Sequence, residues 1–188
     1  MTHAADLVLA ILAYTAVHEA GHALAALALG LPLTGVSLGA GPVLASARLR
    51  GVSLEIRAIP IGGAARFDDR VLEDPGLRSR LAACAAAGPA ANVMAAGILA
   101  ALVPSLVPAG GHWPTPAQLF WTLNAVCGPL NLLVPIPPTD GARAVALAFG
   151  AGPGLIARLD RAGAVVWAAA TCAFAAALAA RIMHATGV

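Results

Sequence analysis

The chain has 188 residues, of which 60% are hydrophobic and only 11% are charged, and its mean hydropathy is +0.84. A soluble domain averages roughly half apolar and a quarter charged, so this composition excludes a soluble protein and predicts an integral-membrane one. The net charge of +2 is too small to indicate a nucleic-acid partner. The length predicts a single membrane-embedded domain, 1–188.

Four stretches are long and apolar enough to cross a bilayer, which takes about 20 helical residues. They lie at about 5–30, 81–103, 116–134 and 162–183. The predicted fold class is therefore an all-α integral-membrane protein with about four transmembrane helices. No basic residue precedes the first stretch, so we interpret it as a retained membrane helix and not as a secretory signal.

The connection 31–80 between the first two spans is polar and has a different pattern. Hydrophobic residues occupy every second position of 52–58, which is typical of a β-strand. Residues 43–50 are the expected partner strand, with Gly51 at the turn, and the pair Gly62-Gly63 is expected to end the second strand. The sequence thus predicts a small β-hairpin or sheet inserted between the first and second spans.

Arginine is distributed unevenly between the connections. Seven arginines lie in 31–80 and three in 135–161, whereas the connection 104–115 contains none. By the positive-inside rule, the first and third connections face the cytoplasm and both termini face outside.

The first span contains the motif His18-Glu19-Ala20-Gly21-His22. Positions i and i+4 share one face of a helix, so both imidazoles can bind one metal ion. Glu19 is adjacent and can take a proton from a water molecule, and zinc is the metal that best suits such a site. The alternative is that these are buried polar residues of the core. Ionisable groups are costly within a membrane, and this favours the metal site.

A catalytic zinc usually has three protein ligands, so a third is expected. Asp140 follows the third span in a proline-rich segment, 135–141. On the residues alone, Asp140 can equally be this ligand or the N-cap of a helix over 141–149. A class of metalloprotease that recruits Glu55 in its place is disfavoured, because Glu55 lies within the strand pattern.

The motifs occur together in a recognisable order. HEAGH at 18–22 is followed by PIGG at 60–63, GPAAN at 88–92 and NLLVPIPPTDG at 131–141. This set resembles the site-2 protease family of intramembrane zinc metalloproteases. Two departures are visible: Val134 lengthens the last motif by one residue, and Ala142 stands where a second glycine is common.

The resemblance implies roles for individual residues. Asp140 would be the third ligand of one Zn²⁺ per chain, beside the two histidines. Asn92 would stabilise the oxyanion of the reaction. The alternative is an interhelical hydrogen bond, and the resemblance favours the catalytic role. Asn131 and the pair Gly62-Gly63 would bind the substrate.

The resulting prediction is an intramembrane zinc metalloendopeptidase that hydrolyses peptide bonds of single-pass transmembrane substrates in regulated intramembrane proteolysis. Its expected location is the lipid bilayer of a prokaryotic cell membrane, as a multi-pass protein with its active site toward the cytoplasm. Homo-oligomerisation or a regulatory membrane partner remains open. The alternative is a non-proteolytic homologue that binds and sequesters a partner protein.

Overall fold

The computed structural model describes residues 3–68, 71, 73–107 and 114–166, and within them the chain is mostly helical with one small sheet. The main elements, in chain order, are α1 (His3–Ala28), β1 (Leu33–Leu49), β2 (Val52–Phe67), α2 (Arg78–Leu102), α3 (Pro116–Leu133) and α4 (Asp140–Ala148). Residues 153–166 are also helical.

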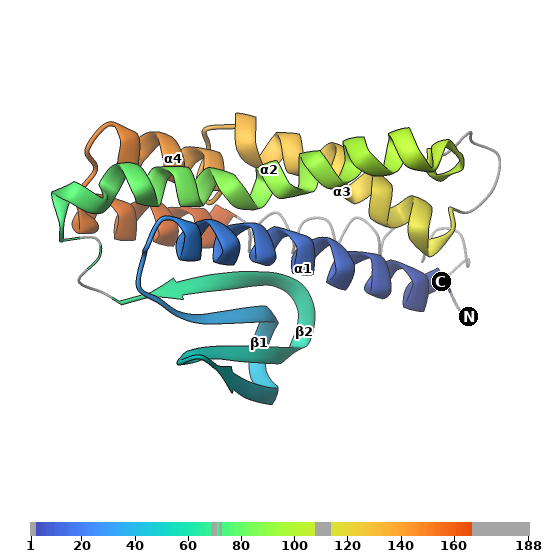
Figure 1. Ribbon diagram of the computed structural model, residues 1–188, viewed down its shortest axis with the longest axis horizontal. Coiled ribbons are helices and arrows are strands. Elements are labelled where there is room, and N and C mark those ends of the chain that lie inside the picture. The colour runs from blue at the N-terminus through green and yellow to red at the C-terminus, as the bar shows by residue number, and fades with distance from the viewer. Residues whose placement is uncertain (1–2, 69–70, 72, 108–113, 167–188) are drawn as a thin grey trace, which may run out of the picture.

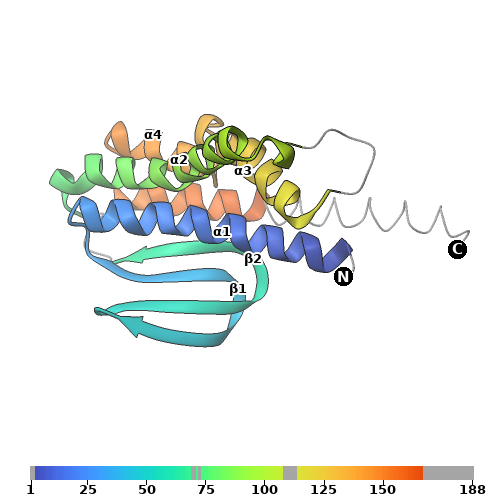
Figure 2. The same ribbon diagram turned by 45° about the vertical axis from the view of Figure 1, so that its right-hand side comes forward.

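Helix α1 lies between the sheet and the other helices. Figures 1 and 2 show β1 and β2 along one side of α1, with α2, α3 and α4 on its other side. Two opposite faces of α1 are therefore in contact with protein. A residue on this helix can point either toward the helical bundle or toward the sheet.

Small residues allow α1 and α2 to pack closely. A Cβ atom on Gly21 would lie only 2.6 Å from the carbonyl oxygen of Ala87 and 2.7 Å from the Cβ of Ala91. Glycine and alanine at such a crossing are typical of helix pairs in membranes, where close van der Waals contact drives association.

Within the described residues, α1 and α2 are long and apolar enough to span a membrane. Only 33% and 28% of the residues in their most apolar windows are buried, so most of these side chains face outward. The core helix of a soluble protein would be mostly buried. The count of four spans remains a prediction: α3 is an 18-residue helix carrying two asparagines, and the expected span 162–183 extends beyond the described residues.

The hairpin forms with the predicted turn but runs further than expected. β1 and β2 pair in an antiparallel sheet, and Arg50 and Gly51 form the turn with φ angles of 49° and 88°. The prediction that Gly62-Gly63 ends the strand is wrong, because β2 continues to Phe67. Gly62 has a φ of 74°, a conformation that glycine adopts without strain, and here it bends the strand without ending it.

The bend makes β2 fold back along β1. Residues 35–38 of β1 have pairing partners both in 53–56 and in 63–66. The last part of β2 is thereby brought beside α1 (Figure 1).

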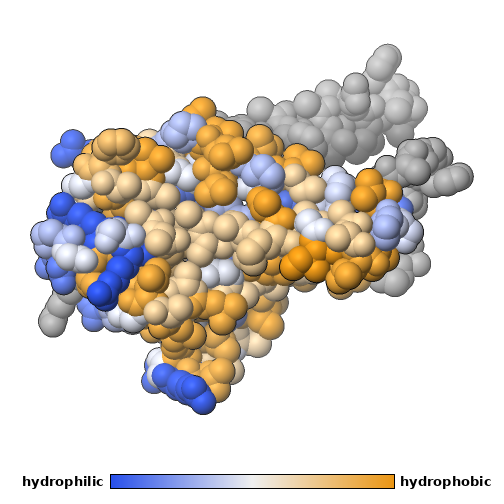
Figure 3. Space-filling model, turned by 45° about the horizontal axis from the view of Figure 1, so that its top comes forward, coloured by the Kyte–Doolittle hydropathy of each residue, from blue (hydrophilic) through white to orange (hydrophobic). Residues whose placement is uncertain are grey.

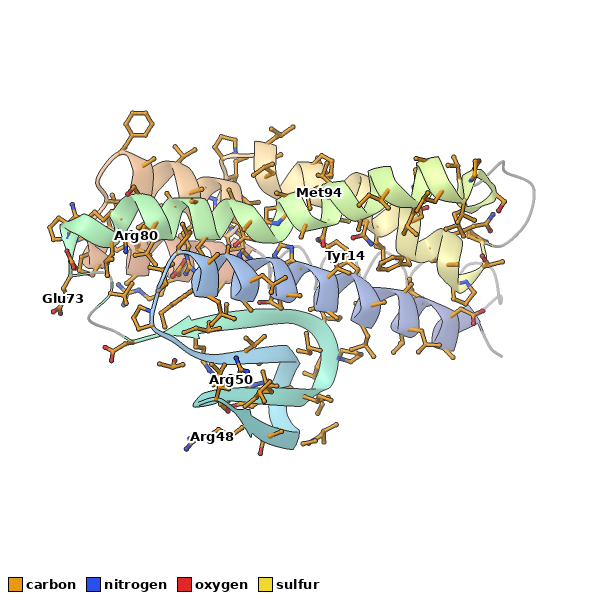
Figure 4. The ribbon with its side chains drawn as sticks, in the orientation of Figure 1. Tyr14, Arg48, Arg50, Glu73, Arg80 and Met94 are labelled. Carbon is orange, nitrogen blue, oxygen red and sulfur yellow. The ribbon has the colours of Figure 1, made fainter. Side chains whose placement is uncertain are left out.

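Hydrophilic and apolar surfaces are separated on the molecule. Figure 3 shows hydrophilic side chains at one end of the helical bundle and at the tip of the hairpin, and mostly apolar side chains between them. Arg48 and Arg50 lie at the hairpin tip, whereas Glu73 and Arg80 lie at the bundle end where α2 begins (Figure 4). This division is the one that a membrane protein requires.

Candidate metal centre

Three side chains predicted to bind a metal converge, although 122 residues separate His18 from Asp140. The Oδ2 atom of Asp140 lies 2.9 Å from His18 Nε2 and 3.5 Å from His22 Nε2, and the two Nε2 atoms are 3.1 Å apart. Both histidines are buried. The helical spacing brings the imidazoles together, and the packing of α4 against α2 adds the carboxylate.

The three ligand atoms fit a zinc ion. Zinc binds imidazole nitrogen and carboxylate oxygen at about 2.0–2.2 Å, which places tetrahedral ligand atoms about 3.3–3.6 Å apart. The observed separations of 2.9, 3.1 and 3.5 Å lie within about half an ångström of that triangle. Two imidazoles and one carboxylate are also a common ligand set for catalytic zinc.

The helix-capping interpretation of Asp140 is wrong, because Thr139 is the N-cap of α4. The Thr139 hydroxyl accepts a hydrogen bond from the Ala142 N–H at 3.2 Å, and Asp140 is the first helical residue. Gly141 allows α4 to start against the end of α3, since a Cβ there would lie 2.0 Å from the Leu132 carbonyl oxygen. The Asp140 carboxylate is thus free to face the histidines.

The amide of Asn131 holds this carboxylate in place. Its Nδ2 donates to Asp140 Oδ2 at 2.7 Å, and its Oδ1 accepts from the Asp140 backbone N–H at 3.0 Å. The nitrogen and the oxygen of the Asn131 amide thus both form hydrogen bonds with Asp140. The contact of Asn131 with a substrate remains a prediction.

Glu19 lies on the face of α1 that meets the sheet. It is buried, and its Oε2 has no hydrogen-bond partner among the described residues. A Cβ on Gly63 would lie 2.7 Å from both Cγ and Oε1 of Glu19, so only glycine leaves room for this carboxylate beside β2. A buried carboxylate oxygen without a partner is costly, which indicates that it serves chemistry or a bound group.

The two predicted substrate-binding glycines differ in their surroundings. Gly63 contacts Glu19, whereas no atom lies within 4 Å of a Cβ built on Gly62. Gly62 supplies the bend of β2, and Gly63 supplies the space for the carboxylate.

The imidazoles also have partners on their outer side. The Cys84 carbonyl oxygen lies 2.8 Å from His22 Nδ1, and the Asn92 amide nitrogen lies 3.2 Å from His18 Nδ1. The Tyr14 ring stacks on His18 with 6.1 Å between centroids and lies between α1 and α2 (Figure 4).

Sequence reasoning missed two of these neighbours. Tyr14 precedes His18 by four residues, and this helical spacing could have identified it. The role of Cys84 comes from its backbone carbonyl, for which the sequence carries no signal.

An apolar cavity of about 490 Å³ opens between α1 and the sheet. Its lining includes Ala20 of α1, Val36 of β1 and Leu54 of β2, and Glu19 lies on its wall. The Glu19 carboxylate therefore borders a space that suits apolar groups.

Glu55, the alternative third ligand, is engaged elsewhere. Its carboxylate binds Arg66 at 2.5 Å and Arg57 at 2.6 Å within the sheet. Hydrogen bonds from Arg66 and then Arg57 lower the pKa of Glu55 to about 2. It is not part of the one group of candidate metal ligands found among the described residues.

Comparison with known proteins agrees with this site. No curated protein matches the chain. The sequence profile of Peptidase family M50 matches residues 6–110, which is more than half of the chain and includes the HExxH motif and Asn92. The match ends before Asp140, and the structure brings that residue to the two histidines. The chain therefore belongs to peptidase family M50, and it is a membrane protein with the ligand group of a metallopeptidase.

Proposed function

We propose that this protein is an intramembrane zinc metalloprotease that hydrolyses peptide bonds of transmembrane substrate proteins. The observation that carries the proposal is that His18 and His22, on a helix apolar enough to span a bilayer, lie within 3.5 Å of the Asp140 carboxylate and of each other. Ionisable groups in such a helix are costly and mark functional sites. The buried carboxylate of Glu19 on the same helix supplies the base.

The three ligands would hold the zinc ion, and zinc would supply a Lewis acid that polarises the scissile carbonyl and lowers the pKa of water. Glu19 takes a proton from the attacking water as the water oxygen bonds to the carbonyl carbon. It passes this proton to the amide nitrogen as the C–N bond breaks, which yields a carboxylate and an amine. Asn131 keeps the Asp140 carboxylate directed at the histidines throughout.

The expected substrate is a single-pass membrane protein whose helix unwinds locally at the site. The apolar lining of the cavity beside Glu19 supports a substrate segment with apolar side chains. The proposed location is the membrane of a prokaryotic cell. The arginine distribution supports an active site that faces the cytoplasm. Regulated intramembrane proteolysis is the expected physiological setting.

The decisive experiment compares Glu19→Gln with the wild type in detergent, measuring bound zinc and cleavage of a membrane-spanning peptide. Glu19→Gln should keep its zinc and lose about 10²–10⁴-fold in turnover, since general-base catalysis typically contributes this much. Glu73→Gln makes the same chemical change at an exposed position and serves as the control. Turnover by Glu19→Gln at the rate of the control would reject the proposal.

A further inference from the structure

Each of the three ligand side chains has an outer hydrogen-bond partner. The Cys84 carbonyl faces His22, the Asn131 amide faces Asp140, and the Asn92 amide faces His18. Asn92 is fully buried, with 0% of its surface exposed, and its Oδ1 has no hydrogen-bond partner among the described residues. An unpaired amide oxygen at such a position is unusual and requires an explanation.

The hydrogen bond between His22 and the Cys84 carbonyl shows which tautomer a metal-binding imidazole adopts at this site. A backbone carbonyl can only accept, so the Nδ1 atom of His22 must carry a proton and donate it to Cys84 at 2.8 Å. A neutral imidazole with its proton on Nδ1 presents a lone pair at Nε2. That atom is the one directed at His18 and Asp140.

The same reasoning applies to His18. Its Nε2 also faces the other two ligand atoms, so metal binding requires the lone pair at Nε2 and the proton at Nδ1. The atom 3.2 Å from this Nδ1 is the amide nitrogen of Asn92, which is itself a donor. A half-turn of the amide exchanges its nitrogen and oxygen, which have nearly the same size and position.

We propose that Asn92 is a positioning residue, whose Oδ1 accepts a hydrogen bond from His18 Nδ1–H and holds the ring with Nε2 toward the metal. In this arrangement the buried oxygen gains a partner, and the amide nitrogen takes the position that has none among the described residues, so the proposal rests on the tautomer that His18 needs. The inference rests on the proposed zinc site and assigns Asn92 to the metal ligand instead of to the oxyanion.

The experiment measures zinc dissociation from the purified full-length protein by competition with a chelator. Removing an outer partner of a metal-bound histidine typically weakens metal binding 10–100-fold, so Asn92→Ala should raise the zinc Kd by about that factor. Asn92→Asp retains an acceptor at the same place and should keep the Kd within about threefold of the wild type. Asn124→Ala is the control, because this equally buried amide donates to the Phe120 carbonyl of its own helix and should leave zinc binding unchanged.

Three results would overturn the inference. The first is a zinc Kd of Asn92→Ala equal to that of the wild type. The second is a loss of zinc affinity in Asn92→Asp as large as in Asn92→Ala. The third is an equally large loss of zinc affinity in Asn124→Ala. An oxyanion role alone predicts the first of these, with turnover reduced at unchanged zinc affinity. A wild-type protein that binds zinc but cleaves no membrane peptide would contradict the proposed function and leave this inference standing.

Discussion

Replacing Gly88 with alanine should displace a metal ligand from the neighbouring helix. A Cβ at position 88 would lie 2.3 Å from His22 Nε2, 2.6 Å from Cε1 and 2.7 Å from Cδ2. Ordinary van der Waals contact begins at 3.4 Å, so the methyl group and the ring must separate by about 1 Å in a close-packed interior. A misplacement of about 1 Å can cost about 100-fold in rate, and we expect turnover to fall by at least this factor.

The zinc affinity should fall as well, because the methyl group meets the ligand atom itself and movement of the ring also disturbs the 2.8 Å contact with Cys84. The assay is chelator competition for zinc together with cleavage of a membrane-spanning peptide. Gly97→Ala is the matched control on the same helix, because nothing lies within 4 Å of its added Cβ. It should retain activity and gain up to about 1 kcal/mol in stability from helix propensity. If Gly88→Ala binds zinc and turns over like Gly97→Ala, the close approach of α1 and α2 at His22 is wrong.

Three further predictions concern the carboxylates. Asp140→Ala should lower zinc affinity and turnover together, since a three-ligand site loses one ligand and its charge. Metal analysis of the purified variant checks this prediction. Full zinc occupancy would exclude Asp140 as a ligand. Gly63→Ala should lower turnover by about 10–100-fold at unchanged zinc affinity, because the added Cβ would lie 2.7 Å from Glu19 Oε1. A decrease in zinc affinity as large as the decrease in turnover would contradict this prediction. The Glu55–Arg66 ion pair should stabilise the hairpin most above pH 4.5 and lose this effect as the pH falls toward about 2, since folding lowers the pKa of the carboxyl from 4.5 to about 2. Hydrogen exchange of the strands, corrected for intrinsic rates, should show this loss in the wild type and not in Glu55→Gln.

Local patterns predicted much of the framework because they depend on residues close in the chain. The HExxH motif lies on a helix, and its i, i+4 spacing brings the two imidazoles together, as expected. The hairpin turn at Gly51 was predicted from strand alternation and a residue that tolerates positive φ. Two of the apolar stretches form helices long enough to cross a bilayer.

Predictions made from one or two residues without their tertiary contacts were either wrong or left two roles open. Gly62-Gly63 was expected to end a strand, but pairing with β1 on the far side of the bend extends β2 to Phe67. Sequence alone could not choose between ligand and cap for Asp140, because both roles suit an aspartate before a helix. Thr139 decides it, since one helix end needs only one capping side chain.

The amino-acid sequence by itself determined the membrane class of this protein and the helix that carries the two histidines, because composition and helical periodicity act over a few turns of chain. It also predicted Glu19 as the base. Only the tertiary structure decided which carboxylate lies beside the two histidines and which asparagine side chains contact these three residues. His18 and Asp140 are 122 residues apart in the chain, and their side chains are 2.9 Å apart because α4 packs against α2 and because Gly141, the second residue of α4, fits against the end of α3. Hydrogen bonds between residues so distant depend on the packing of whole helices, and no local pattern encodes that packing.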